Sequence, residues 1–362
     1  MLNSQTAESV IDHALSLGAD FAELFVEKNE TNVVSTLSDE VQSVESGINF
    51  GIGLRLVYGS KVLYGYTNKT DRDELLRIVS VLAAKDLRDP VSTLKSFNFN
   101  QISDIHPASK ILSVDAEIAS KVAYLMAADR AARAAGEQIS QTRGSCMQRE
   151  QHVQLYNSDG LHTNDKRNYI RSSLTAIAAD GNEQATGSSN DGGLLGWEIE
   201  AGLNPQKTGE EAARQALVNL TAKPCPSGHM PVIIGNGFGG VIFHEACGHL
   251  LETTSVAKKA SVFHDQMGEM IASPIVSAVD DGTMANEWGS INIDDEGMPT
   301  QRTQLIKDGR LTNFLVDRIG AQQTGFARSG SGRRESYKYA PASRMRNTFI
   351  EPGESQMDDM IA

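Results

Sequence analysis

The sequence has few cysteines, a deficit of basic residues and no long apolar run. Cys146, Cys225 and Cys247 are the three cysteines in 362 residues, and they form no framework of close pairs, which favours a reducing compartment. Lysine and arginine number 33 against 46 acidic residues, a formal charge of −13 that argues against broad binding to nucleic acid or anionic membranes. No segment approaches the roughly 18 consecutive apolar residues of a membrane span, and the N-terminus lacks the features of a signal peptide. We therefore expect a soluble, cytoplasmic protein.

Apolar periodicity predicts both helices and strands. Residues 71–85, 114–135 and 209–222 have helical spacing. Residues 21–67 and 139–188 alternate apolar and polar residues between Gly-containing turns, which indicates antiparallel strands. The expected fold class is α+β.

A Pro-rich stretch, "KPCPSGHM" at 223–230, is the best candidate for a domain boundary. We predict an N-terminal domain of mixed helices and antiparallel sheet over 1–223, and a β-rich domain over 224–362 that carries one important helix. The apolar run "PVIIGNGFGG" at 231–240 is expected to form a buried strand followed by a Gly-rich turn.

That helix is predicted within "GVIFHEACGHLLE", residues 240–252, which contains His244, Glu245 and His249. Positions five apart on a regular α-helix differ by about 140°, so the two histidines cannot share a face unless the helix is distorted. A π-bulge would align them, and Gly248 would ease the distortion. A metal pair is one interpretation, and buried, hydrogen-bonded helix residues are the other.

If the histidines bind a metal, the neighbouring acids have defined roles. Glu245 follows the first histidine as the general base does in zinc peptidases, and could take a proton from metal-activated water. Glu252, three residues after His249, is a second acidic candidate. Three protein ligands are usual in a catalytic zinc site, so two histidines alone are incomplete.

The segments around the motif have further recognisable features. "FHEACGHLLE" is followed by "VDDGTM", "GSINIDDEGMPTQ", "GSGRRESY" and "RMRNTFIEPGE", and preceded by "DFAELFVE", "GIGLRLV" and "ALVNLTA". In this collinear order the chain resembles the TldD/PmbA family of modulator-of-gyrase-type metalloproteases. It resembles the TldD side, which carries the His-Glu-x-x-x-His motif that PmbA-type partners lack.

The resemblance implies a zinc-dependent peptidase that acts in the cytoplasm on short or unfolded peptides, as a homodimer or as a heterodimer with a PmbA-like subunit. It implies that His244 and His249 bind Zn²⁺ and that Glu245 is the catalytic base. The family's third ligand is a cysteine in a C-terminal section beyond Ala362, so we expect the chain to be truncated relative to the family. The alternative is a non-catalytic assembly or peptide-binding subunit on the same scaffold.

Several other residues have two interpretations. Arg333 and Arg334, in a Gly/Ser loop, could bind the substrate's carboxylate or form an inter-domain salt bridge. "IDDEG" at 293–297 resembles a cation site, but Asp and Gly in such a run favour a turn. Cys247 is expected to pack as a small apolar residue, and His264 to be structural.

Overall fold

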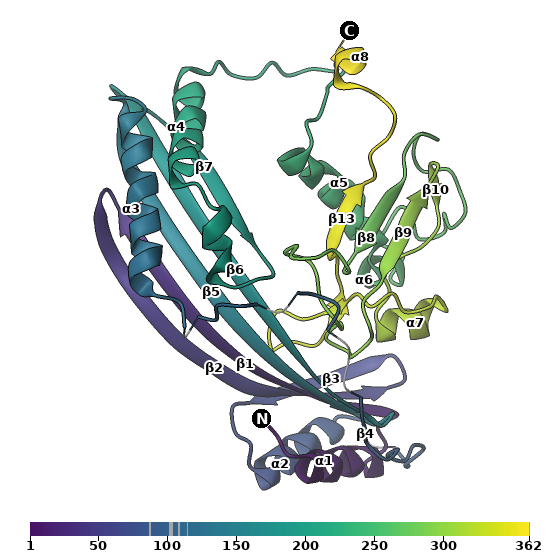
Figure 1. Ribbon diagram of the computed structural model, residues 1–362. Coiled ribbons are helices and arrows are strands. Elements are labelled where there is room, and N and C mark those ends of the chain that lie inside the picture. Colours follow the sequence, from purple (N-terminus) through teal and green to yellow (C-terminus); the bar gives the residue numbers. More distant parts are fainter. Residues whose placement is uncertain (87, 101–103, 108, 114, 362) are drawn as a thin grey trace.

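The computed structural model describes residues 1–86, 88–100, 104–107, 109–113 and 115–361. A long, curved sheet of seven strands dominates the N-terminal part (Figure 1). Its order is β3-β2-β1-β5-β6-β4, with β7 also paired to β6, and all pairs except β4 with β6 are antiparallel. The strands are β1 (Phe21–Leu37), β2 (Glu40–Tyr58), β3 (Lys61–Thr67), β4 (Asn98–Phe99), β5 (Ile139–Asn157), β6 (Leu161–Asp180) and β7 (Glu183–Gly193).

Tight turns connect the long strands, as the sequence predicted. Gly59, Gly160 and Gly181 have φ values of 60°, 90° and 58°, so each occupies the left-handed region that favours glycine. Between β1 and β2 the turn instead uses Ser38 and Asp39, with φ of 44° and 72°. The predicted antiparallel strands are confirmed.

Four longer helices pack on the sheet in two pairs (Figure 1). One pair is α1 (Ser4–Ser16) and α2 (Arg72–Ala83), and the other is α3 (Ile118–Ala134) and α4 (Pro205–Thr221). The helix predicted from residue 209 begins four residues earlier, because Asn204 caps it and Pro205 occupies its first turn. A short 3-10 helix, η1 (Trp197–Gly202), precedes α4.

The C-terminal part combines short strands with short helices, so the α+β fold class is confirmed. Strands β10-β9-β8-β13 form one sheet, and β11 and β12 form a two-stranded ribbon. The elements are η2 (Gly237–Gly240), α5 (Val241–Ala246), η3 (Gly248–Leu251), α6 (Thr253–Val256), β8 (Ala278–Asp281), β9 (Arg302–Lys307), β10 (Arg310–Leu311), α7 (Arg318–Thr324), β11 (Gly332–Arg333), β12 (Ala342–Ser343), β13 (Asn347–Ile350) and α8 (Met357–Ile361). None of the helices in the described residues is long and apolar enough to span a membrane.

The buried strand predicted at residues 231–240 is wrong. Residues 231–235 have no regular secondary structure, and Val232, Ile233 and Phe238 are exposed, Phe238 by 88%. An apolar run becomes a strand only where a neighbouring strand pairs with its backbone, and none of the described strands does so here.

A buried ionic network joins the large sheet to the C-terminal part. Arg55 on β2 contacts Glu23 on β1 at 2.8 Å and Glu296 at 2.7 Å, and all three side chains are buried. Arg167 on β6 likewise contacts Asp295 at 2.7 Å. Residues 293–297 form the predicted turn, in which the Asp294 carboxylate accepts hydrogen bonds from the backbone of Glu296 and Met298.

Candidate metal centre

The histidine motif lies on a broken helix. Helix α5 ends at Ala246, Cys247 has φ −132° and ψ −54°, and the chain continues as the 3-10 turn η3. The distortion that brings the two histidines together is therefore a break at Cys247 and not a π-bulge. Gly248 follows the break, where a Cβ atom would lie 2.2 Å from Sδ of Met345, so a larger residue would require the Met345 side chain to move.

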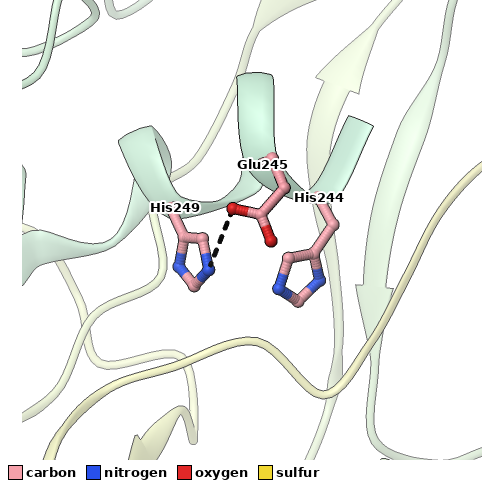
Figure 2. Close-up of side chains that lie close together, drawn as sticks. All are labelled: His244, Glu245 and His249. Carbon is pink, nitrogen blue, oxygen red and sulfur yellow. Dashed lines mark ion pairs between the residues drawn. The ribbon is translucent and has the colours of Figure 1, made fainter. Parts of the chain in front are cut away.

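The break places His244, Glu245 and His249 together on one side of the segment (Figure 2). One ligand atom from each side chain lies within 4.8 Å of the other two. The imidazole centroids are 4.7 Å apart, and Oε2 of Glu245 is 3.9 Å from Nε2 of His249. The side chain of His249 is 42% exposed and His244 is half-buried, so the alternative of two buried helix histidines is wrong.

Glu252 orients His249 from behind. Its Oε1 lies 3.1 Å from Nδ1 of His249, and its Oε2 accepts a hydrogen bond of 2.8 Å from Arg344. Burial raises the pKa of Glu252, and the charges of Arg344 and His249 oppose that rise. Glu252 thus faces the nitrogen that points away from Glu245, and leaves Nε2 of His249 available to a metal.

Cys247 and His264 lie outside this cluster. Cys247 is partly buried against the core of the C-terminal part, and burial raises the pKa of its thiol to about 11. It therefore packs as a protonated apolar residue, as predicted. Nδ1 of His264 lies 3.0 Å from the carbonyl oxygen of Ser261.

The donor set fits a zinc ion. Two imidazoles and one carboxylate are among the ligands that Zn²⁺ uses in proteins. Among the residues that the structure describes, His244, Glu245 and His249 form the single group of three His, Cys, Asp or Glu side chains close enough to share an ion.

The two candidate substrate arginines have different environments. Arg334 is buried in the ionic network, where it pairs with Glu23 and donates to the carbonyl of Asp295. Arg333 is half-buried and, with part of Arg334, lines a groove of about 550 Å³ between the large sheet and the C-terminal part. We call it the arginine groove, because its lining includes Arg149, Arg333, Arg334, Arg344 and Arg346. Arg149 belongs to no motif, and Arg344 begins the segment "RMRNTFIEPGE" without any pattern there that marks it as a groove residue.

Three family models cover most of the chain. They describe PmbA/TldA metallopeptidase domain 1, central domain and C-terminal domain, and match residues 22–85, 112–220 and 227–362. The chain belongs to the TldD/PmbA metallopeptidase family. The resemblance seen in the sequence is thereby confirmed.

Relatives from distant organisms extend this finding. A metalloprotease TldD homolog of Haemophilus influenzae is 32% identical over the whole chain, which spans 76% of that protein. A protein of Saccharolobus solfataricus named a zinc metalloprotease TldD homolog is 22% identical, over 97% of this chain and 77% of its own. A crystal structure from Thermotoga maritima, named as a modulator of a DNA gyrase, has the same fold, with a TM-score of 0.78 at 18% identity over 99% of this chain and 79% of its own.

Proposed function

We propose that the chain is a zinc-dependent peptidase subunit in which His244 and His249 bind the metal and Glu245 transfers protons. The observation that carries this proposal is the convergence of these three side chains on one exposed side of a broken helix. The name of the Saccharolobus relative supports the choice of zinc. Short or unfolded peptides are the proposed substrates.

The metal and the two acidic side chains have separate roles in the proposed reaction. Zinc, when bound, polarises the scissile carbonyl and lowers the pKa of water at the site. Glu245 takes the proton of the attacking water and delivers it to the leaving amine, and its side chain is 65% exposed, so water and substrate can reach it. Glu252 accepts a hydrogen bond from Nδ1–H of His249, which fixes the tautomer with a free Nε2.

The test combines zinc content with peptide hydrolysis. Near-stoichiometric zinc by plasma mass spectrometry should be lost in His244→Ala and kept in His264→Ala, a matched control outside the cluster. Glu245→Gln should keep zinc and its fold but lose about 10²–10⁴-fold in the rate of hydrolysis. Full activity in Glu245→Gln would exclude the proposed role of this residue.

One observation favours a second candidate, a non-catalytic peptide-binding or assembly subunit. If Glu245 is the base, the described residues of the cluster leave two protein ligands, one fewer than is usual. This candidate would be supported if the chain binds peptides but does not bind zinc and does not hydrolyse them.

We also propose that the chain works in the cytoplasm as a dimer, with itself or with a PmbA-like subunit. Exposed apolar side chains precede the motif, including Val232, Ile233 and Phe238, and a partner could cover them. Light scattering on the chain alone, and after mixing with a PmbA-like subunit, distinguishes a monomer, a homodimer and a heterodimer.

A further inference from the structure

The arginine groove concentrates positive charge on an acidic protein. Its lining contains five arginines and one acidic residue, Glu335, whereas the whole chain has a formal charge of −13. The large sheet contributes Arg149 from β5, and the C-terminal part contributes the others. A cleft that is lined by charges of one sign focuses the electrostatic field and attracts ligands of the opposite charge.

Two of these arginines are held by internal ion pairs. Arg334 pairs with Glu23, and Arg346 donates to Asp280 at 2.6 Å with both side chains buried. One guanidinium nitrogen of Arg344 pairs with Glu252, and the Arg344 side chain is half exposed. These three arginines explain how the groove is built, but at most one of them is available to a ligand.

Arg149 and Arg333 are different, because no carboxylate pairs with either of them directly, although the charge of Arg333 acts on buried Asp295 from beyond ion-pair distance. Within the part of the chain that the structure describes, neither guanidinium lies within ion-pair distance of a carboxylate. Nε of Arg149 is also buried without a hydrogen-bond partner among the described residues. A guanidinium fork matches a carboxylate in geometry and charge, so this pair is suited to bind one.

Aromatic side chains hold this arrangement in place. Tyr169 stands directly opposite Arg149 in the pairing of β5 with β6, and the guanidinium lies 4.8 Å from its ring centroid. Tyr169 in turn contacts Trp288 with ring centroids 5.2 Å apart. Because Tyr169 is buried, the stack limits the rotation of Arg149 and aims it at the groove.

The groove adjoins the candidate metal centre. Arg344 in its wall donates to Glu252, which contacts His249, so a single carboxylate separates a groove arginine from a metal-ligand candidate. Met345, also in the wall, lies against Gly248 of the motif. These contacts put the wall of the groove next to the residues that support His249 and the motif helix.

We infer that the arginine groove binds carboxylate side chains of the peptide, so that Asp or Glu near the scissile bond is preferred. Arg149 and Arg333 are the specificity-determining residues, and Trp288 and Tyr339 offer apolar contact beside them. This inference rests on the proposed peptidase function for the position of the scissile bond, but carboxylate binding by the groove does not require turnover.

The test uses two fluorescent peptides that differ by one Glu-to-Gln exchange, and Glu245→Gln protein, so that binding is measured without cleavage. The Glu peptide should bind about tenfold more tightly in fluorescence anisotropy, and added salt should reduce the difference. Equal binding of the two peptides would overturn the inference.

Variants then locate the contact. Arg149→Gln and Arg333→Gln should each reduce the preference for the Glu peptide several-fold. Arg143→Gln should leave it unchanged, because Arg143 carries the same charge on the same strand but lies about 20 Å away. A preference unchanged in all three variants would also overturn the inference.

Hydrolysis by the wild-type chain separates the two proposals. Cleavage of both peptides at equal kcat/KM would support the proposed peptidase function and exclude a carboxylate preference of the arginine groove. If neither peptide is cleaved but the Glu peptide still binds in an Arg149-dependent way, carboxylate binding by the groove would be supported and the peptidase function excluded.

Discussion

Oε1 of Glu252 lies 3.1 Å from Nδ1 of His249, while Nε2 of the same ring faces Glu245. The buried carboxylate therefore holds the imidazole between two acids with different tasks. One acid sets the ring's tautomer, and the other stands on the side where a metal would bind. Such carboxylate–histidine pairs raise the basicity of the ligand and fix its orientation.

The first prediction concerns this pair. Glu252→Gln should weaken zinc binding about 10-fold to 100-fold, because a neutral amide supports the imidazole less strongly. A chelator-competition titration measures the dissociation constant. Glu269→Gln is the control, since it removes the same charge from an exposed position in the same part of the chain. Unchanged zinc affinity in Glu252→Gln would show that the hydrogen bond does not position the ligand.

The second prediction concerns the buried network. Arg55→Met should lower the free energy of unfolding by about 3–5 kcal/mol, because Glu23 and Glu296 would remain buried without their shared cation. Arg77→Met is the control, since Arg77 forms an exposed, solvent-screened pair with Glu74 and should change stability much less than Arg55→Met does. Urea denaturation of the two variants measures both values. Equal, small losses would mean that Arg55 contributes no more than a surface pair.

Local patterns predicted much of this fold. The β1–β2 and β5–β6–β7 strands follow from alternation and from turns such as the one at Gly160, since neighbouring strands are joined by short connections. Helix α2 follows from its spacing and from Asp71, which caps it. The motif histidines were predicted as a pair because their spacing is readable in one short segment.

Properties that depend on contacts between distant residues could not be predicted from local sequence patterns. Residues 231–235 failed as a strand because strand formation needs a pairing partner, which periodicity does not specify. The break at Cys247 could not be distinguished from a π-bulge, since either distortion aligns residues five apart. Arg149 and Arg344 meet in one groove only through folding, and they are 195 positions apart, 344 minus 149.

The third prediction is a pH dependence. Burial, and then the neighbouring charge of Glu296, raises the pKa of Asp294 to about 7, against about 3.9 in an unfolded chain. The folded state thus holds this proton more tightly, and the resulting stability is fully present below about pH 3.9 and is lost as pH rises toward 7. Within that window Asp294 alone should lower stability by roughly 1.4 kcal/mol per pH unit.

Asp294→Asn tests this relation, because the amide cannot ionise. The variant should gain stability relative to the wild type between pH 5 and pH 7.5, measured by denaturant titration at both values. Asp308→Asn is the control, since this carboxylate is exposed and should show no such relative gain. A constant difference between Asp294→Asn and the wild type across this range would mean that Asp294 is ionised throughout.

The fourth prediction concerns the thiols, whose surroundings differ. Cys225 is exposed, whereas burial raises the pKa of Cys146 and of Cys247 to about 11. The thiolate is the reactive form, so iodoacetamide at pH 7.5 should modify Cys225 rapidly in the native protein and the other two slowly. Peptide mass mapping measures each site, and all three should react at similar rates in urea. Rapid native labelling at Cys247 would show that the turn after α5 opens, and would contradict a packed, structural role for this cysteine beside the metal motif.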